Sequence, residues 1–211
     1  MGVETEIKLH IPDRKLAEKI VGDGFLSKMA FPEKWQCVPM EAVYYDTCRM
    51  DLQKAGIAYR VRREGDKWIA AVKKGGDRDS HLQHRQEWNI KVPSPAPDLK
   101  PFWNTPVGNE LRQVAGNKSM GALHSCRFDR WYLELPLGED TLVELAVDTG
   151  KITAGGLREP ICEMELELKQ GRLSLMEEMA SMLCIRYHLI PEPRSKFSRG
   201  LALFHRLNPQ G

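Results

Sequence analysis

The sequence predicts an α+β fold in which a closed eight-stranded antiparallel β-barrel carries helices packed on its outside. Three observations favour this fold. Eight segments alternate polar and apolar residues, and most are joined by turns that are too short for parallel pairing. The polar strand faces carry clustered charges and few of the Ser, Thr, Asn and Gln residues typical of exposed strands. The apolar strand faces need cover, which helices with apolar stripes can supply.

The N-terminal part contains two expected strands and one helix. The first strand is expected over residues 3–10, because charged and apolar side chains alternate there. Pro12-Asp13 then starts a helix whose apolar stripe covers residues 16–21, and two glycines end it. The second strand is expected over residues 37–46, before a helical turn at residues 50–54.

A hairpin and a fifth strand follow. Residues 57–64 and 68–73 are expected to pair antiparallel, because Gly65-Asp66 is a turn sequence between them. A polar, glycine-containing loop is expected at residues 75–81. The fifth strand then occupies residues 83–92, where alternation resumes.

The remaining strands lie beyond a proline-rich connection, which breaks regular structure. A short helix is expected at residues 109–115. Two long strands follow at residues 122–135 and 141–148, separated by a turn that contains proline and glycine. The clearest alternation in the chain, acids against apolar residues, predicts the eighth strand at residues 161–169.

The C-terminal part is expected to be helical. Residues 173–183 place apolar side chains at helical spacing, and a basic loop at residues 191–200 leads into a final helix at residues 201–207. The helices at 13–21, 173–183 and 201–207 are the expected cover of the barrel. Residues 1–211 are expected to form a single domain, since 42% hydrophobic content is enough for a core.

The composition excludes several classes of function. Balanced charge, with 31 Lys+Arg against 29 Asp+Glu, argues against a general nucleic-acid-binding surface. Five cysteines without a CxxC pair favour reduced thiols, and the histidines, which lack metal-ligand spacing, are expected on the surface or in loops. No apolar run approaches a membrane span or a signal peptide, so a cytoplasmic protein without a membrane partner is expected.

Like charges gather on single strand faces. Examples are Glu4 with Glu6, Arg60 with Arg62, and the acidic run that begins at Glu163. In most soluble β-proteins such faces point to solvent. Like charges two residues apart repel each other, however, so a shared ligand inside the barrel is the more economical reason to gather them. The lumen would then hold charges of both signs: Glu4, Glu6, Lys8, Arg60, Arg62, Lys73, Arg85, Glu87, Asp148, Glu163 and Glu165.

Such a lumen has to hold water or a charged ligand, because isolated buried charges are costly. Carboxylate oxygens suit hard divalent cations such as Mg²⁺ or Mn²⁺, and a wall of Arg and Lys suits phosphates. A metal-bound chain of phosphates would satisfy both kinds of side chain at once.

Motifs along nearly the whole chain carry a family resemblance. In chain order they are Glu4-x-Glu6-x-Lys8, Tyr45-Asp46-Thr47, Arg60-x-Arg62, Lys73, Arg85-x-Glu87, Arg130, the run 143–150, Glu163-x-Glu165-x-Glu167 and Ser195-Lys196. With these motifs the sequence resembles the CYTH superfamily, also called the triphosphate tunnel metalloenzymes. The resemblance implies Mg²⁺ or Mn²⁺ as cofactor and a small-molecule triphosphate as substrate.

The resemblance also implies roles for individual residues. The implied metal ligands are Glu4, Glu6, Asp148, Glu163 and Glu165. The implied phosphate ligands are Lys8, Arg60, Arg62, Lys73, Arg85, Arg130 and Lys196. Glu87 would lie near the metal or the attacking water. The expected catalytic set is therefore Glu4, Glu6, Lys8 and Glu87.

Some positions stay open at this stage. Glu144 and Glu167 share the charged face but could lie at the rim of the tunnel. Arg127 and Arg130 are three residues apart on one strand, so they cannot both point inward, and Arg130 is the favoured one. The general base, the preferred metal and the oligomeric state stay open as well.

The bacterial inorganic triphosphatases are the subgroup that the sequence resembles most. Residues 194–200 are similar to the tail that in those proteins leads into a CHAD domain, so the chain is either a stand-alone form or a fragment that a CHAD domain would follow. The expected reaction is metal-dependent hydrolysis of the terminal phosphoanhydride of inorganic triphosphate. The alternatives are a class IV adenylate cyclase, a thiamine or nucleoside triphosphatase, and a non-catalytic module that binds polyphosphate or nucleotides.

Overall fold

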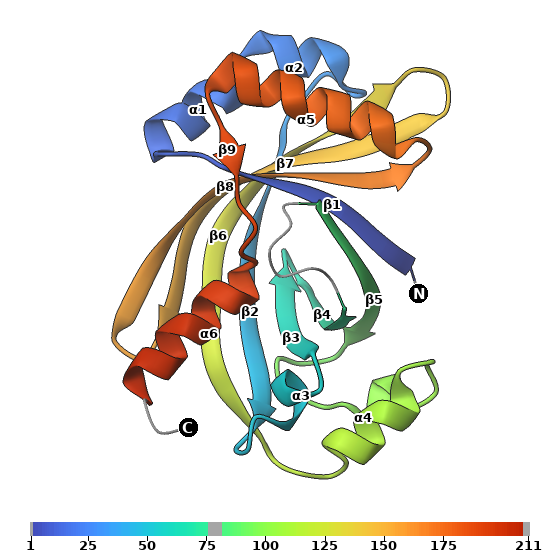
Figure 1. Ribbon diagram of the computed structural model, residues 1–211, viewed down its shortest axis with the longest axis vertical. Helices are drawn as coiled ribbons and strands as arrows, with labels where there is room; N and C mark the ends of the chain where they lie inside the picture. Colours follow the sequence, from blue (N-terminus) through green and yellow to red (C-terminus); the bar gives the residue numbers. More distant parts are fainter. Residues whose placement is uncertain (1, 76–81, 209–211) are drawn as a thin grey trace.

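The computed structural model describes residues 2–75 and 82–208. The expected polar loop at residues 75–81 lies, apart from Gly75, outside the described residues. The predicted barrel is confirmed: strands pair in the order β5-β4-β3-β2-β6-β7-β8-β1, and β1 pairs with β5 to close the ring (Figure 1). Every neighbouring pair is antiparallel, and the short β9 adds to β1 outside the ring. The strands are β1 (Gly2–His10), β2 (Gln36–Thr47), β3 (Ile57–Glu64), β4 (Lys67–Lys74), β5 (Leu82–Val92), β6 (Met120–Leu137), β7 (Thr141–Ala154), β8 (Leu157–Gln170) and β9 (Ile190–Pro191).

Helices pack on two sides of the barrel. In Figure 1, α1, α2 and α5 lie together over one end of the molecule, and α3 and α4 lie at the other. None of the helices within the described ranges is both long and apolar enough to cross a membrane. The helices are α1 (Arg14–Gly22), α2 (Gly24–Met29), α3 (Asp51–Lys54), the 3-10 turn η1 (Lys100–Phe102), α4 (Gly108–Val114), α5 (Leu173–Tyr187) and α6 (Lys196–Leu207).

Two helical boundaries differ from the prediction, and a capping side chain explains each. Gly24 begins α2, which was not predicted, because the Asp23 carboxylate accepts a hydrogen bond from the Phe25 amide at 3.0 Å. The predicted loop at residues 191–200 is wrong in its second half. There α6 starts at Lys196, because the Ser195 hydroxyl accepts a hydrogen bond from the Ser198 amide at 3.1 Å.

The last two barrel strands are longer than predicted. β7 continues beyond residue 148 to Ala154, and β8 begins at Leu157 instead of residue 161. Gly155 turns the chain between them with a φ of 52°, which an L-side chain rarely adopts. The additional residues extend the wall of the barrel toward α6.

Three apolar clusters hold the fold together. One joins the outer faces of β1, β6, β7 and β8 to α1, α2 and α5. A second joins the outer faces of β3, β4 and β5 to η1 and α4. The third cluster lies on the inner strand faces. It packs Leu203 of α6 against Met40, Phe128 and Ile152. These strand residues lie on the same faces as the charged side chains of the lumen. α6 is therefore seated on the inner wall at one end of the barrel.

His124 belongs to this third region, so the expectation that every histidine is on the surface or in a loop is wrong for it. Its ring is 3% exposed and stacks on Tyr44 with the ring centroids 4.5 Å apart. A Cβ at Gly200 of α6 would lie 2.2 Å from His124 Nδ1, so a glycine is needed where the helix crosses the ring. The strand parity that His124 shares with Phe128 would have indicated this burial.

Burial of His124 predicts a pH dependence of stability. Burial lowers the pKa of His124 from 6.5 to about 4, so the unfolded chain takes up a proton first as the pH falls. Stability present above pH 6.5 should therefore be lost between pH 6.5 and about 4, by up to about 3 kcal/mol. Urea unfolding at several pH values measures this slope. His124→Phe should flatten the slope, whereas His84→Gln, at an exposed position, should keep it; an equal slope in all three proteins would contradict the assignment.

Candidate active site in the barrel lumen

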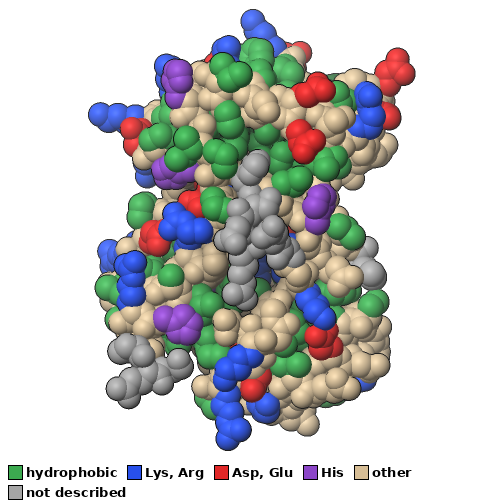
Figure 2. All heavy atoms as spheres, viewed as in Figure 1, with side chains coloured by type: hydrophobic (Ala, Val, Ile, Leu, Met, Phe, Trp, Pro, Cys, Tyr) green, Lys and Arg blue, Asp and Glu red, His purple; other side chains and the backbone are tan. Residues whose placement is uncertain are grey.

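The barrel encloses a cavity of about 1230 Å³, and about half of the residues that line it are charged. On the face shown in Figure 2, Lys and Arg side chains are interspersed with Asp and Glu, and no broad surface of one charge is seen. Charge of both signs is concentrated in this cavity. Charged residues facing the cavity include Glu4, Glu6, Lys8, Arg60, Arg62, Lys73, Arg85, Glu87, Arg130, Glu165 and Lys196.

The alternation of β1 explains how these charges reach the interior. Ile7 and Leu9 point outward into the apolar cluster under the helices. Glu6 and Lys8 therefore point inward, and they are only 4% and 3% exposed. The predicted orientation of the charged strand faces is confirmed by this arrangement.

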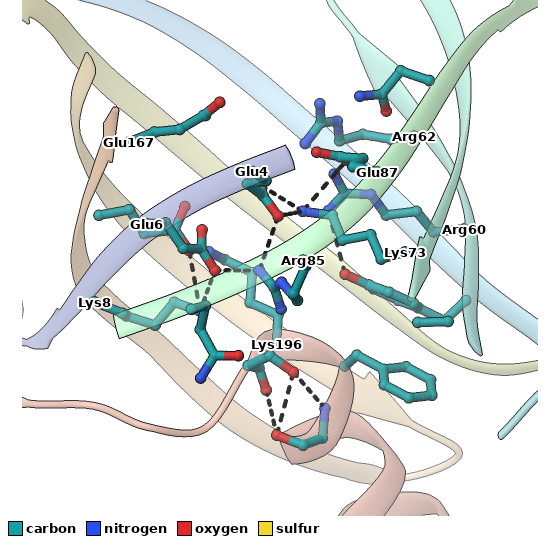
Figure 3. Close-up of a pocket in the computed structure, with 18 of the residues that line it drawn as sticks. Glu4, Glu6, Lys8, Arg60, Arg62, Lys73, Arg85, Glu87, Glu167 and Lys196 are labelled. Carbon is teal, nitrogen blue, oxygen red and sulfur yellow. Dashed lines mark hydrogen bonds and ion pairs between the residues drawn. The ribbon is translucent and has the colours of Figure 1, made fainter. Parts of the chain in front are cut away.

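One side of the lumen is a basic wall formed by β3, β4 and β5 (Figure 3). Lys73 Nζ donates to the two carboxylate oxygens of Glu4 at 2.7 and 2.8 Å. Arg85 also contacts Glu4, at 3.2 Å, and forms a hydrogen bond with Glu6. These pairs follow from the strand register, which places Glu4 directly opposite Arg85.

The basic wall has more donors than its own carboxylates satisfy. The Nε atoms of Arg60, Arg62 and Arg85 are buried and have no hydrogen-bond partner within residues 2–75 and 82–208. Buried donors without partners are costly, and oxygen atoms of a bound anion would satisfy them. Burial also lowers the pKa of Lys73, as do Arg60 and Arg85, against the attraction of Glu4. The wall is therefore suited to an anion.

Glu87 lies within this wall. Burial alone would raise its pKa, but Lys73, Arg60 and Arg62 outweigh that effect and hold the pKa at about 2. The distances are 3.4 Å from Lys73 Nζ and 3.5 Å from Arg60 Nη2. Glu87 is therefore ionised at neutral pH and is a weak base.

An acidic cluster lies on the opposite side, across β7 and β8. Asp148 is paired with Glu163 in the register of the two strands, and Glu165 follows on the same face. One oxygen from each of these three carboxylates lies within 4.8 Å of the others, an arrangement that could hold a metal ion. Asp148 and Glu163 are fully buried, so their charges need partners.

Cations from β6 and α6 partner the acidic cluster. Arg130 donates to both oxygens of Asp148, at 2.8 and 2.6 Å, and also to Glu165. From α6, Arg199 Nη1 donates to Glu163 at 2.7 Å, and Lys196 Nζ contacts all three carboxylates.

The surroundings shift the pKa values of the clustered acids in opposite directions. Burial raises the pKa of Glu163 even though Lys196 and Lys8 oppose it. Burial would do the same to Glu165, but Lys196, Arg130 and Lys8 hold its pKa well below the usual range. Glu165 is therefore the firmly charged member of the cluster, and it is also the one that lines the cavity.

The structure does not place all predicted metal ligands together. Within the described residues, only Asp148, Glu163 and Glu165 form a group with metal-ligand spacing. Glu4 and Glu6 lie on the same inner surface but contact the basic side chains Lys73 and Arg85. Their roles as metal ligands stay predictions.

The structure shows where the residues lie whose orientation the sequence left open. Glu144 and Glu167 contact Lys169 at 3.3 and 2.9 Å, with side chains 20% and 29% exposed, which puts them toward the rim. Arg130 points into the lumen, as favoured. Arg127 points outward, where it contacts Glu41 at 3.0 Å with a side chain that is 72% exposed.

Two residues at the site were missed in the sequence. Arg199 was assigned to a loop, although a helix starting at Ser195 would have placed it one turn after Lys196. Tyr44 lines the cavity, and Arg60 donates to its hydroxyl at 3.4 Å. By contrast, Asp46 of the Tyr45-Asp46-Thr47 motif is structural, because its carboxylate accepts hydrogen bonds from the Leu52 and Gln53 amides of α3, both at 2.9 Å.

Comparison with known proteins identifies the family. The model of the CYTH domain matches residues 2–201. The chain belongs to the CYTH family. Among curated proteins, this CYTH chain is similar to the inorganic triphosphatase of Haemophilus influenzae, with 28% identity over 167 residues. The match covers 76% of this chain but only 44% of that relative, so the chain spans less than half of the relative's length.

Solved structures share the fold of this CYTH chain. The Hippeastrum protein HpAC1, named for adenylyl cyclase and described as having a dominant triphosphatase activity, superposes with a TM-score of 0.69 at 16% identity. That match covers 96% of this chain and 95% of HpAC1. The protein PH1819 from Pyrococcus horikoshii gives a TM-score of 0.58 at 16% identity, covering 94% of this chain and 99% of its own. At such low identity the likeness concerns the fold alone.

Proposed function

We propose that this CYTH chain is a divalent-metal-dependent triphosphatase that hydrolyses the terminal phosphoanhydride of inorganic triphosphate inside its barrel. One observation carries the proposal: a basic wall with unpartnered guanidinium donors faces a carboxylate cluster across one cavity. A chain of phosphates with a divalent cation is the ligand that satisfies both sides. The similarity to an inorganic triphosphatase supports the choice of substrate.

The basic side chains would bind and orient the phosphates. Guanidinium groups form paired hydrogen bonds with phosphate oxygens, and charge-assisted bonds of this kind are roughly twice as strong as neutral ones. Phosphoryl transfer needs little covalent chemistry from the protein, so positioning and neutralisation of charge supply most of the catalysis. The proposed phosphate ligands are Lys8, Arg60, Arg62, Lys73, Arg85, Arg130 and Lys196.

The acidic cluster fits a hard divalent cation, because its donors are buried carboxylate oxygens close to one another. Asp148, Glu163 and Glu165 would hold Mg²⁺ or Mn²⁺, with Glu4 and Glu6 as further proposed ligands. When bound, the ion supplies neutralisation of phosphate charge and a more acidic water. Glu87, with a pKa of about 2, can orient a water molecule but is too weak a base to deprotonate it alone.

The decisive assay compares substrates. The protein is incubated with tripolyphosphate, ATP or thiamine triphosphate and Mg²⁺ or Mn²⁺, while phosphate, cyclic AMP and binding are measured. Phosphate release should be fastest from tripolyphosphate. Cyclic AMP from ATP would favour an adenylate cyclase, faster release from thiamine triphosphate or ATP would favour an organic triphosphatase, and binding without turnover would indicate a non-catalytic module.

Removal of the metal should abolish turnover. Excess EDTA is expected to reduce phosphate release from tripolyphosphate to background. Without the ion, the carboxylates of the cluster neither neutralise phosphate charge nor make a water molecule more acidic. Adding Mg²⁺ or Mn²⁺ in excess over the chelator should restore the rate. Full activity in EDTA, after prior dialysis against the chelator, would contradict metal dependence.

Loss of a phosphate ligand should weaken substrate binding. Arg60→Ala is expected to raise KM for tripolyphosphate by roughly 10- to 100-fold, because charge-assisted contacts to phosphate are lost. Steady-state kinetics measure the change. Arg63→Ala is the matched control, since Arg63 lies on the outer face of the same strand, where it donates to the Gly65 carbonyl at 2.9 Å. An equal KM in the two variants would remove Arg60 from the site.

A further inference from the structure

Lys196 occupies the centre of the acidic cluster. Its Nζ lies 2.6 Å from Asp148 Oδ2, 2.5 Å from Glu163 Oε1 and 3.0 Å from Glu165 Oε1. These carboxylates are the ones whose oxygens lie within 4.8 Å of one another. Mg²⁺ binds oxygen at about 2.0–2.1 Å, so an ion held by all three groups would have to take the place of the ammonium.

The charge of the cluster leads to the same conclusion. Its three carboxylates are contacted by three cations at hydrogen-bond distance, Lys196, Arg130 and Arg199. Lys8 adds a fourth positive charge at 3.5 Å from Glu165. A divalent ion would therefore enter a cluster whose negative charge is already compensated, and release of one cation would favour its entry.

Lys196 is the cation best placed to leave. It lines the cavity, whereas Asp148 and Glu163 lie behind it. It stands in the first turn of α6, and a lysine side chain can change rotamer without movement of the helix. Arg199, one turn later, would keep α6 attached through its 2.7 Å contact with Glu163. The displaced ammonium would then point into the lumen, toward the proposed phosphates.

We propose that Lys196 is a tethered counter-ion that neutralises the acidic cluster until a divalent ion displaces it into the lumen, where it binds phosphate. The inference rests on the proposed function, because it requires the cluster to bind the ion. Its consequence is positive coupling: metal binding frees a phosphate ligand, and a bound triphosphate stabilises the displaced ammonium.

The test measures Mn²⁺ affinity in the absence of substrate, by titration calorimetry of the whole chain. Lys196→Met removes the competing charge and should bind Mn²⁺ roughly tenfold more tightly or better. Lys118→Met is the matched control, because Lys118 pairs with Asp51 outside the barrel at 2.9 Å with a side chain that is 52% exposed. It should bind Mn²⁺ as the wild type does.

The possible results separate this inference from the proposed function. Wild-type binding with an unchanged or weaker affinity in Lys196→Met overturns the inference and leaves the triphosphatase proposal standing. No Mn²⁺ binding by any of the three proteins overturns the metal site and the inference with it. If Lys196→Met is unfolded after chelator treatment, Mn²⁺ but not NaCl should restore its circular dichroism spectrum, and failure to do so overturns the inference.

Discussion

Replacing Glu6 by Gln is expected to reduce metal-dependent phosphate release from tripolyphosphate by about 10³-fold or more, while the protein stays folded. Glu6 is 4% exposed and lies between Arg85 and Lys8, so its charge acts directly on two proposed phosphate ligands. Losing one preorganised donor that stabilises developing negative charge typically costs about 10²- to 10³-fold in kcat, and Glu6 positions two such donors, Arg85 and Lys8. Loss of a proposed metal ligand adds to this effect. Glu4→Gln is expected to reduce phosphate release to a similar extent, because Glu4 forms an ion pair with Lys73 at 2.7 Å.

The control for both variants is Glu41→Gln. Glu41 lies on the outer face of β2 with a side chain that is 43% exposed, and its partner Arg127 also points outward. Glu41→Gln removes the same negative charge by the same chemical change, but outside the lumen. Its turnover should therefore equal that of the wild type. Circular dichroism and thermal unfolding check that each variant is folded. Near-full activity in Glu4→Gln and Glu6→Gln would exclude a catalytic role for these two carboxylates.

The inward faces could be predicted because the period of a strand is two residues. Over residues 6–9 of β1 and 162–169 of β8, charged and apolar residues alternate strictly, so the inward or outward direction of one residue gives the direction of the others. Glu6, Lys8 and Glu165 were placed correctly for this reason. The same parity explains why Arg130 and not Arg127 reaches the lumen.

The grouping of the charges could not be predicted, because it depends on register between strands. Alternation gives Glu6 and Glu165 the same face, but the register places Lys8 opposite Glu165 and Glu6 opposite Glu167. The acidic cluster therefore forms between β7 and β8, where Asp148 faces Glu163. Turn lengths and packing set that register, and neither is visible in a strand pattern alone.

The start of α6 was missed because tertiary packing overrides local preference. Ser198 and Gly200 lie within the helix and have weak helix propensity, and a glycine there is unfavourable by roughly 0.5–1 kcal/mol relative to alanine. The structure tolerates Gly200 because a larger side chain would meet the ring of His124. The same contact seats α6 so that Lys196 and Arg199 reach the acidic cluster.

Gly150→Ala should lower the free energy of unfolding by about 3 kcal/mol or more, which corresponds to a fall in Tm of about 6–12 °C for a chain of this size. A Cβ at this position would lie 2.2 Å from the Arg127 carbonyl oxygen and 2.5 Å from Phe128 Cα. Both atoms are backbone, so the strands β6 and β7 would have to separate. The Arg130–Asp148 pair is two residues away in the same register, so activity should fall as well.

Gly156→Ala is the matched control for this variant, because a Cβ there would meet nothing within 4 Å and the backbone is outside the left-handed region. Its Tm should stay within a few degrees of the wild-type value, or rise, since alanine restricts the unfolded chain. Differential scanning calorimetry of the two variants compares the same change within β7 and in the turn that follows β7. Equal Tm values would mean that β6 and β7 do not approach as closely at Gly150 as the structure places them. A large difference would show that this close approach supports the wall of the barrel on which Asp148 stands.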